Sequence, residues 1–463
     1  MTPIEAKFAR LSTDHAPGQE VRQGNAGLDG LLRGDTLPGT PVDFSHGDVN
    51  ASAFAPTPGS LQEFVQGVER GGEQAYTEYR GAADLRLRVA AHLAEFTGAP
   101  VDGANELIIT PGTQGALFLA IASSVTAGDK VAIVRPDYFA NRKLVEFLGG
   151  EIVPVDMRHL ERDSGAGLDL DQLEAAFKAG VRTFLFSNPN NPAGVVYSPE
   201  EIARIADLAR HYDATVIVDQ LYSRLLYAGT RYTHLRALPQ APANVITIMG
   251  PSKTESLSGY RLGVAFGAAH LIDRMEKLQA IVSLRAPGYC QAVLRTWFEE
   301  PAGWMNQRIA GHQAIRDDLI RVLRAVPGLA VRAPEAGSYL FPRLPSLAVG
   351  LHDFVRILRT QAGVTVTPGT EFSPHADDSI RLNFSQNHAA AVQAIERTAQ
   401  LIGRRGWPGG RRCVGSSSRR VPRTRCAAPP GSSPGRAARR WPAVFPCGRS
   451  GGRRRRPRPG GSR

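Results

Sequence analysis

Between about Leu107 and Gly267 the chain alternates short, continuously apolar runs with amphipathic stretches. The apolar runs are rich in Val and Ile and predict strands at Leu107–Thr110, Lys130–Val134, Glu151–Val155, Thr183–Phe186, Thr215–Val218, Val245–Met249 and Gly263–Phe266. The amphipathic stretches predict helices at Gln114–Val125, Phe139–Leu148 and Pro199–His211. Strands that are apolar on both faces and separated by helices indicate an α/β fold, in which helices cover both sides of a mainly parallel sheet.

A second pattern begins near Tyr289 and mixes long helical stretches with short strand-like pieces. It predicts helices at Gln291–Trp297, Asn306–Val326 and His388–Ile402, and strands at Leu329–Val331, Ser338–Pro342, Val364–Pro368 and Ile380–Phe384. We therefore expect a smaller α+β domain at residues 291–402, after a large three-layer domain at residues 46–290.

The two ends of the chain differ from these domains. Residues 1–45 are Gly-rich and irregular, with a weak helical pattern at Ala26–Leu32, and are expected to form an N-terminal arm. Residues 403–463 are rich in Arg, Gly, Pro and Ser and lack the apolar residues of a core, which predicts disorder. Their composition resembles translation of GC-rich DNA in a shifted frame. A genuine disordered basic tail is the alternative.

The net charge of +12 over 463 residues first suggests an anionic partner. However, 18 arginines and no acidic residue lie in residues 403–463, so the rest of the chain is mildly acidic and does not predict nucleic-acid binding. Cys290 is the one cysteine before this tail, which excludes a disulfide framework or a cysteine-rich metal site there. Because neither a signal peptide nor a run of about 18 apolar residues is present, we expect a cytoplasmic protein.

Polar residues that could bind a ligand or take part in catalysis follow the predicted strands, which is where ligands of such sheets bind. Lys253 follows one strand, and a lysine desolvated there becomes a nucleophile for an aldehyde. Arg261, eight residues later, offers a forked donor to a phosphate. Asp219 ends another strand, where its carboxylate can pair with a protonated pyridine nitrogen, and Tyr222 can hydrogen-bond a ring oxygen. Taken singly, the lysine and arginine could be surface residues, and the aspartate could cap the next turn.

Three further segments are weaker indicators. Asn188–Gly194 is a dense turn in which Asn191 could present its amide to a ligand, although Asn, Pro and Gly are turn residues anyway. Pro111–Gly115 precedes a helical pattern, and backbone N–H groups at a helix start form an anion site. Tyr138 is a lone aromatic residue, for which ordinary packing is an equally good explanation.

In combination, these residues resemble the fold-type I pyridoxal-phosphate enzymes, and among them the class I/II aminotransferases related to aspartate aminotransferase. The resemblance extends from about Val42 to Ile402. It rests on the motifs Asn-Asn-Pro-x-Gly, Asp-x-x-Tyr, and Ser-Lys-Thr with an arginine eight residues after the lysine. Such motifs rarely occur together, in this order, by chance.

The resemblance implies pyridoxal 5′-phosphate as the cofactor and assigns roles around its ring. Lys253 would hold the cofactor as a Schiff base and move the substrate's α-proton. Asp219 would pair with the ring nitrogen. Tyr222 and Asn191 would donate to the ring oxygen, and Tyr138 would stack on the ring face.

The resemblance also implies which residues bind the cofactor's phosphate. Arg261, the backbone amides of Thr113 and Gln114, and Ser252 would bind it, and Tyr76 would reach it from the other subunit of a homodimer. Three departures from the family pattern are Gly250, where many relatives carry a hydroxyl residue, Gln220, where Glu is common, and Ala193, where Thr is usual.

On the substrate side, Arg381 would grip the α-carboxylate, next to Asn191, and Gly47 would belong to the N-terminal segment that closes over it. In aspartate-specific relatives an arginine from the neighbouring subunit binds the distal carboxylate, and Arg285 lies in the comparable region. The alternative is a surface or inter-subunit arginine. The implied activity is transfer of an amino group from an L-amino acid to a 2-oxo acid by a ping-pong reaction through pyridoxamine phosphate.

Two other functions stay open at this point. The same scaffold supports β-elimination, cyclisation and oxygen-dependent oxidation of amino acids. A transcription regulator with an aminotransferase-like domain is less well supported, since only about 40 residues precede the matching region and they show no helix-turn-helix pattern.

Overall fold

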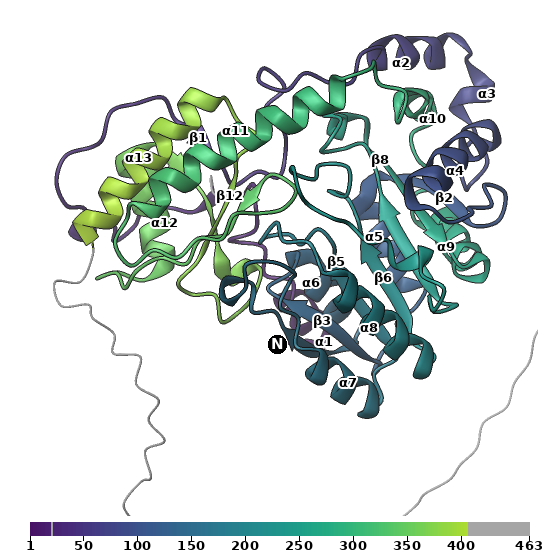
Figure 1. Cartoon of the computed structure of the whole chain (residues 1–463), viewed down its shortest axis with the longest axis horizontal. Coiled ribbons are helices and arrows are strands. Elements are labelled where there is room, and N and C mark those ends of the chain that lie inside the picture. The colour runs from purple at the N-terminus through teal and green to yellow at the C-terminus, as the bar shows by residue number, and fades with distance from the viewer. Residues whose placement is uncertain (20–21, 406–463) are drawn as a thin grey trace, which may run out of the picture. The chain divides into compact units, whose positions relative to one another are not determined.

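The computed structural model describes residues 1–19 and 22–405, which are shown as ribbons in Figure 1. Seven strands form one sheet in the order β2-β8-β7-β6-β5-β3-β4. Strand β8 runs antiparallel to both of its neighbours, and the other neighbouring pairs are parallel, so the prediction of a mainly parallel sheet is confirmed. Each predicted strand is present within one residue at either end: β2 (Leu107–Pro111), β3 (Lys130–Arg135), β4 (Glu151–Asp156), β5 (Thr183–Ser187), β6 (Thr215–Asp219), β7 (Val245–Met249) and β8 (Leu262–Gly267).

Helices cover both faces of this sheet because successive strand residues point to opposite sides. On β6, Val216 and Val218 pack into one apolar cluster while Ile217 packs into the cluster on the other face. Helices α7 (Leu170–Lys178) and α8 (Pro199–His211) cover the first face, and α5 (Gly112–Ala122), α6 (Phe139–Phe147) and α9 (Ala269–Val282) cover the second. The result is the expected three-layer α/β arrangement.

Further helices lie before the sheet and at its edge. They are α1 (Pro3–Ala9), α2 (Ser60–Glu69), α3 (Gly72–Ala75), α4 (Ala83–Thr97) and α10 (Gly288–Gln291). Within the arm, the weak pattern at Ala26–Leu32 yields a single 3₁₀ turn, Asp29–Leu31.

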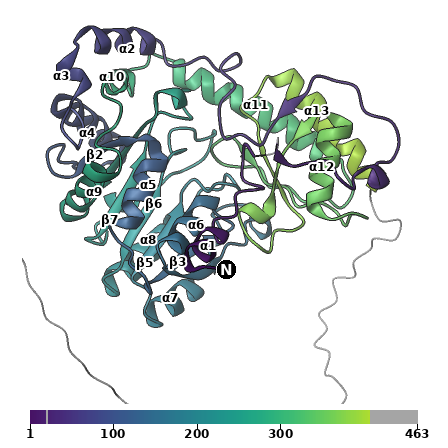
Figure 2. The ribbon, with the colours of Figure 1, turned by 180° about the vertical axis from the view of Figure 1, so that it is seen from behind.

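The C-terminal part is the smaller α+β unit that the sequence predicts. It contains α11 (Trp304–Arg324), α12 (Leu351–Ala362), α13 (His388–Arg405) and a three-stranded sheet of β11 (Thr367–Pro368), β12 (Ile380–Asn383) and β9 (Tyr339–Leu340). Strand β1 (Val42–Asp43) pairs in parallel with β10 (Val364–Thr365), so the N-terminal segment lies against this unit (Figure 2). Leu28 and Phe44 are part of its apolar core.

Three predicted elements differ in the structure, and one of them, Val364–Pro368, is divided into β10 and β11. The expected strand Leu329–Val331 is reduced to one bridge between Ala330 and Arg343. On one side of this bridge the next hydrogen-bonded pair would be Gly328 with Pro345, which has no N–H to donate, so the ladder cannot extend in that direction. The helical pattern Gln291–Trp297 becomes a 3₁₀ helix, Ala292–Thr296.

The predicted tail begins at residue 403, but α13 continues through Arg405, whose side chain is buried. Residues 406–463, which hold the rest of that prediction, lie outside the described residues. The domain boundaries at residues 45, 290 and 402 stay predictions. Among the described residues, no helix is long and apolar enough to cross a membrane.

Candidate active site

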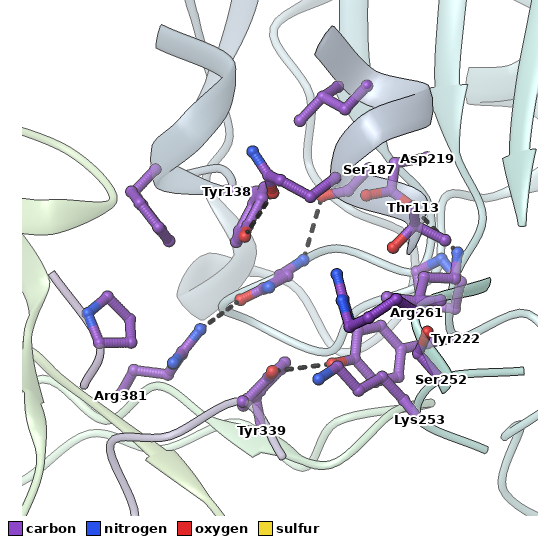
Figure 3. A pocket seen from close by; sticks show the side chains of 18 residues that line it. Thr113, Tyr138, Ser187, Asp219, Tyr222, Ser252, Lys253, Arg261, Tyr339 and Arg381 are labelled. Carbon is purple, nitrogen blue, oxygen red and sulfur yellow. Dashed lines mark hydrogen bonds between the residues drawn. The ribbon is translucent and has the colours of Figure 1, made fainter. Parts of the chain in front are cut away.

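A cavity of about 250 Å³ lies beyond the carboxyl ends of β5, β6 and β7 (Figure 3). Parallel pairing brings these strand ends to one edge, where Ser187 is the register partner of Asp219. The predicted site residues that line the cavity are Gly47, Thr113, Gln114, Tyr138, Asn191, Asp219, Tyr222, Ser252, Lys253, Arg261 and Arg381.

Lys253 lies in the loop that follows β7 and presents its amine to the cavity. Its Nζ forms no hydrogen bond or ion pair with another described residue. The loop around it is fixed by Arg308, whose Nη1 donates to Thr254 O at 2.7 Å, and by the buried carboxylate of Glu255, which pairs with Arg224. The amine is therefore free to react while its backbone is held.

Asp219 and Tyr222 stand beside the lysine on the wall formed by β6. Burial raises the pKa of Asp219 to about 6, against a backbone hydrogen bond from Leu221 that lowers it. At neutral pH this carboxyl is thus still mainly ionised and can pair with a cation. Burial, followed by the neighbouring Tyr339 hydroxyl, raises the pKa of Tyr222 well above its usual value, so Tyr222 stays a proton donor.

An anion cradle faces the same cavity. Helix α5 begins at Gly112 without a side-chain cap, which leaves the N–H groups of its first turn open. The Arg261 guanidinium fills the space beside Gly112, where a Cβ would overlap it. A Cβ on Gly250 would lie 2.9 Å from Thr113 Cγ2, which explains why a larger hydroxyl residue is absent there. Ser252 is buried and donates to Leu262 O at 3.3 Å.

Arg381 reaches the cavity from β12 of the smaller unit and is 1% exposed. Its Nη1 donates to Asn191 Oδ1 at 3.1 Å and its Nη2 to Ser45 O at 2.8 Å. The guanidinium lies 4.3 Å from the ring centroid of Tyr339 and 4.7 Å from that of Phe372. Its buried Nε has no hydrogen-bond partner among the described residues, and none of their carboxylates pairs with the guanidinium. A buried positive charge of this kind calls for an anion.

Three polar residues in or behind the wall of the cavity were not predicted. Tyr339 lines the cavity and shares a 2.7 Å hydrogen bond with Tyr222. Ser187 also lines it, and its Oγ accepts from the backbone N–H of Asn191 at 3.1 Å. Asp137 lies behind Ser187 and accepts from both its Oγ and its N–H, and burial raises the pKa of Asp137 to about 8. The available signal was the position of Asp137 directly before Tyr138, just after the carboxyl end of the strand Lys130–Val134.

Two predicted residues lie away from the cavity. Arg285 stacks on the ring of Tyr76 at 3.7 Å and donates to Thr77 O, while Tyr76 is 72% exposed. Both were assigned to sites shared with a neighbouring subunit, and their roles stay predictions.

An unpartnered lysine, a carboxylate and an anion cradle at the end of a mainly parallel sheet are typical of the fold-type I pyridoxal-phosphate enzymes. The chain belongs to the aminotransferases of class I and II, whose family model matches residues 42–397. It transfers an amino group from an amino acid to a 2-oxo acid.

Similar proteins agree with this assignment. The crystal structure of an aspartate aminotransferase from Rhodobacter sphaeroides 2.4.1 is 64% identical and superposes with a TM-score of 0.84, covering 87% of this chain and 100% of that one. An aspartate aminotransferase of Sulfolobus acidocaldarius is 28% identical over 352 residues, which are 75% of this chain and 87% of the relative. Aromatic-amino-acid aminotransferase 2 of Thermococcus litoralis is 23% identical over 347 residues, which are 75% and 88% of the two chains.

Proposed function

We propose that this aminotransferase binds pyridoxal 5′-phosphate through Lys253 and uses a dicarboxylic amino acid as the amino donor. The observation that carries the first part is the unpartnered amine of Lys253, in one cavity with the Asp219 carboxylate and the Arg261 cradle. These groups fit the cofactor's aldehyde, ring nitrogen and phosphate in turn. When bound, the cofactor supplies an electron-accepting ring that stabilises negative charge on the substrate's α-carbon.

Residues around the cofactor ring would each have a separate role. Lys253 would act as the base that takes the proton from the substrate's α-carbon and would deliver it to C4′, the aldehyde carbon of the cofactor. Asp219, ionised near neutral pH, keeps a proton on the ring nitrogen. Tyr222 and Asn191 donate to the ring oxygen, and Tyr138 covers the ring face.

The phosphate is held by the open end of α5 together with Arg261. The backbone N–H groups of Thr113 and Gln114 supply neutral donors, and the guanidinium supplies charge. Ser252 positions the loop beside this phosphate site through its hydrogen bond to Leu262 O.

Arg381 binds the α-carboxylate, which amino-acid donors and 2-oxo acid acceptors both carry. Its buried charge has no other anion among the described residues, and Asn191 and the Ser45 carbonyl fix its orientation. Gly47 lies beside Lys253 and leaves the space that a side chain would close. These contacts hold the α-hydrogen toward the lysine amine.

The distal carboxylate of the substrate needs a further cation. Among the described residues, the cations that line the cavity are Lys253, Arg261 and Arg381, and each already has a role. We therefore assign the distal carboxylate to Arg285 of a second copy of the chain. The 64% identical aspartate aminotransferase supports a dicarboxylic donor such as aspartate.

A homodimer supplies that second copy. Large apolar side chains are exposed on α2, at Tyr76 and at the end of α9, and Arg285 stacks on Tyr76. These exposed side chains are Leu61, Val65, Val68, Tyr76, Ile281, Val282 and Leu284. Large apolar side chains exposed in this number favour an interface with another copy of the chain. The cytoplasm stays the predicted compartment.

An absorbance titration tests this function. The cofactor-loaded protein is mixed with single amino acids, and the 2-oxo acid formed is measured against the loss of the lysine-bound absorbance band. We expect aspartate or glutamate to give stoichiometric 2-oxo acid. If only apolar or aromatic amino acids react, the dicarboxylic assignment is wrong, and if no amino acid reacts, the assigned cofactor chemistry is wrong.

A further inference from the structure

Tyr339 forms a hydroxyl pair with Tyr222 inside the cavity. The side chain of Tyr339 is 2% exposed, and the two hydroxyl oxygens lie 2.7 Å apart (Figure 3). The rings meet edge to face, with centroids 5.4 Å apart. This bond joins β9 of the smaller unit to the turn after β6, which carries Asp219.

The ring and the hydroxyl of Tyr339 have separate surroundings. The ring stacks against the Arg381 guanidinium at 4.3 Å. The hydroxyl oxygen lies 3.0 Å from the position that a Cβ on Gly47 would occupy, and Lys253 Nζ lies 3.7 Å from the same position. The hydroxyl and the reacting amine therefore both lie beside Gly47, while the ring supports the substrate-binding arginine. Removing the hydroxyl alone leaves the second contact intact.

The direction of the hydroxyl bond follows from counting protons. A phenol has one proton to donate and can accept hydrogen bonds on its oxygen. Once Tyr222 donates its proton to the cofactor's ring oxygen, it can only accept from Tyr339. A hydrogen bond accepted by a hydroxyl strengthens the bond that this hydroxyl donates.

We propose that Tyr339 is a positioning residue that acts through Tyr222, because its hydroxyl donates to Tyr222 and strengthens the bond from Tyr222 to the cofactor's ring oxygen. This inference rests on the proposed function. In the protonated form, the proton on the nitrogen that joins Lys253 to the cofactor stabilises the negative charge of the ring oxygen. When that proton is lost, hydrogen-bond donors of the protein matter most to this oxygen. Tyr339 thus favours the deprotonated form.

The test is a pH titration of the visible absorbance of the lysine-bound cofactor. Tyr339→Phe removes one oxygen and keeps the ring against Arg381. We expect the pH midpoint to rise by about half a pH unit, as the loss of one neutral hydrogen bond allows, and the KM for the amino acid to stay unchanged. Tyr227→Phe is the matched control, because it removes a buried hydroxyl that donates to Gly337 O outside the cavity. It should leave the midpoint unchanged.

A double-mutant cycle separates an action through Tyr222 from a direct action on Lys253. In a Tyr222→Phe background, Tyr339→Phe should no longer move the midpoint. An equal shift in both backgrounds overturns the inference, as does an unchanged midpoint in Tyr339→Phe with Tyr222 present. If the wild-type protein forms no lysine-bound band, the proposed function fails first, and that result is distinct from a normal band that Tyr339→Phe leaves unmoved.

Discussion

The Arg381 guanidinium donates to the side-chain oxygen of Asn191 at 3.1 Å, so the residue assigned to the substrate and the residue assigned to the cofactor ring hold each other. Arg381 comes from β12 of the smaller unit and Asn191 from the turn after β5. The bond therefore joins both parts of the fold at the point where substrate and cofactor meet.

Replacement of Arg381 by Lys tests the carboxylate assignment. Lysine keeps the charge but loses the planar fork that reaches Asn191, Ser45 O and a carboxylate together. We expect the KM for the amino acid to rise about 10- to 100-fold, with a smaller change in kcat. Arg321→Lys, on the exposed face of α11, is the control and should change neither. A normal KM in the Arg381 variant would remove this residue from the substrate site.

Asp137 provides a pH-dependent prediction for the cofactor-free protein. Burial raises its pKa from about 4 to about 8, so the folded state binds its proton more tightly than the unfolded state does. The stability attached to this group is thus present at low pH and decreases as pH rises through this window. The side chain in Asp137→Asn is neutral at every pH, so the stability of this variant should not decrease for this reason as pH rises.

The measurement is the free energy of unfolding of wild type and Asp137→Asn between pH 5 and pH 8. We expect the free energy of unfolding of the variant, relative to that of wild type, to increase by more than about 1 kcal/mol from pH 5 to pH 8. Since Asp137 anchors Ser187, which accepts from the Asn191 backbone, the variant also reports on that turn. A constant difference between the two proteins would contradict the buried carboxyl as the cause.

The loop that carries Lys253 should depend on a buried ion cluster. Arg224 pairs with the fully buried carboxylate of Glu255 and, at 2.8 Å, with Glu300. Arg224→Ala leaves Glu255 buried without its cation and should lower the free energy of unfolding by about 3–5 kcal/mol. Lys277→Ala, which breaks an exposed pair with Asp273, should lower it by less than about 0.5 kcal/mol. Chemical denaturation distinguishes these, and equal effects would show that the cluster has no special role.

The C-terminal boundary can be located by two truncations. Arg405 is buried, and its guanidinium donates to Leu31 O and Gln361 Oε1. A chain that ends after Arg405 should keep the melting temperature and activity of the full chain. A chain that ends after Ile402 loses these contacts and should melt at a lower temperature. Loss of activity in the longer variant would contradict the view that residues 406–463 are dispensable.

Local patterns predicted the sheet well because continuous apolar runs leave few alternatives to a strand covered on both faces. They also predicted the groups at the strand ends, since the carboxyl ends of Thr183–Ser187 and Thr215–Asp219 must meet. The sequence did not reveal Tyr339, because an aromatic residue in an apolar run such as Ser338–Pro342 ordinarily indicates packing. Its hydroxyl acquires a partner only when β9 is brought beside Tyr222 by the tertiary fold.

The short strands of the smaller unit were harder to predict for a similar reason. Val364–Pro368 reads as one strand, but its two halves pair with different partners, β1 and β12. The first half pairs with a strand more than 300 positions away and the second half with a strand on the other side of a turn, and no local pattern contains the point where the partner changes.

The most direct test of the central claim is to locate the lysine that holds the cofactor. The protein loaded with pyridoxal 5′-phosphate is reduced with borohydride, digested and analysed by mass spectrometry, with Lys253→Ala and Lys277→Ala treated in parallel. The structure predicts a phosphopyridoxyl group on Lys253 in wild type and in the Lys277 variant, and neither the group nor the absorbance band in Lys253→Ala. A cofactor found on another lysine, or a Lys253→Ala protein that still binds it covalently and turns over substrate, would contradict the account.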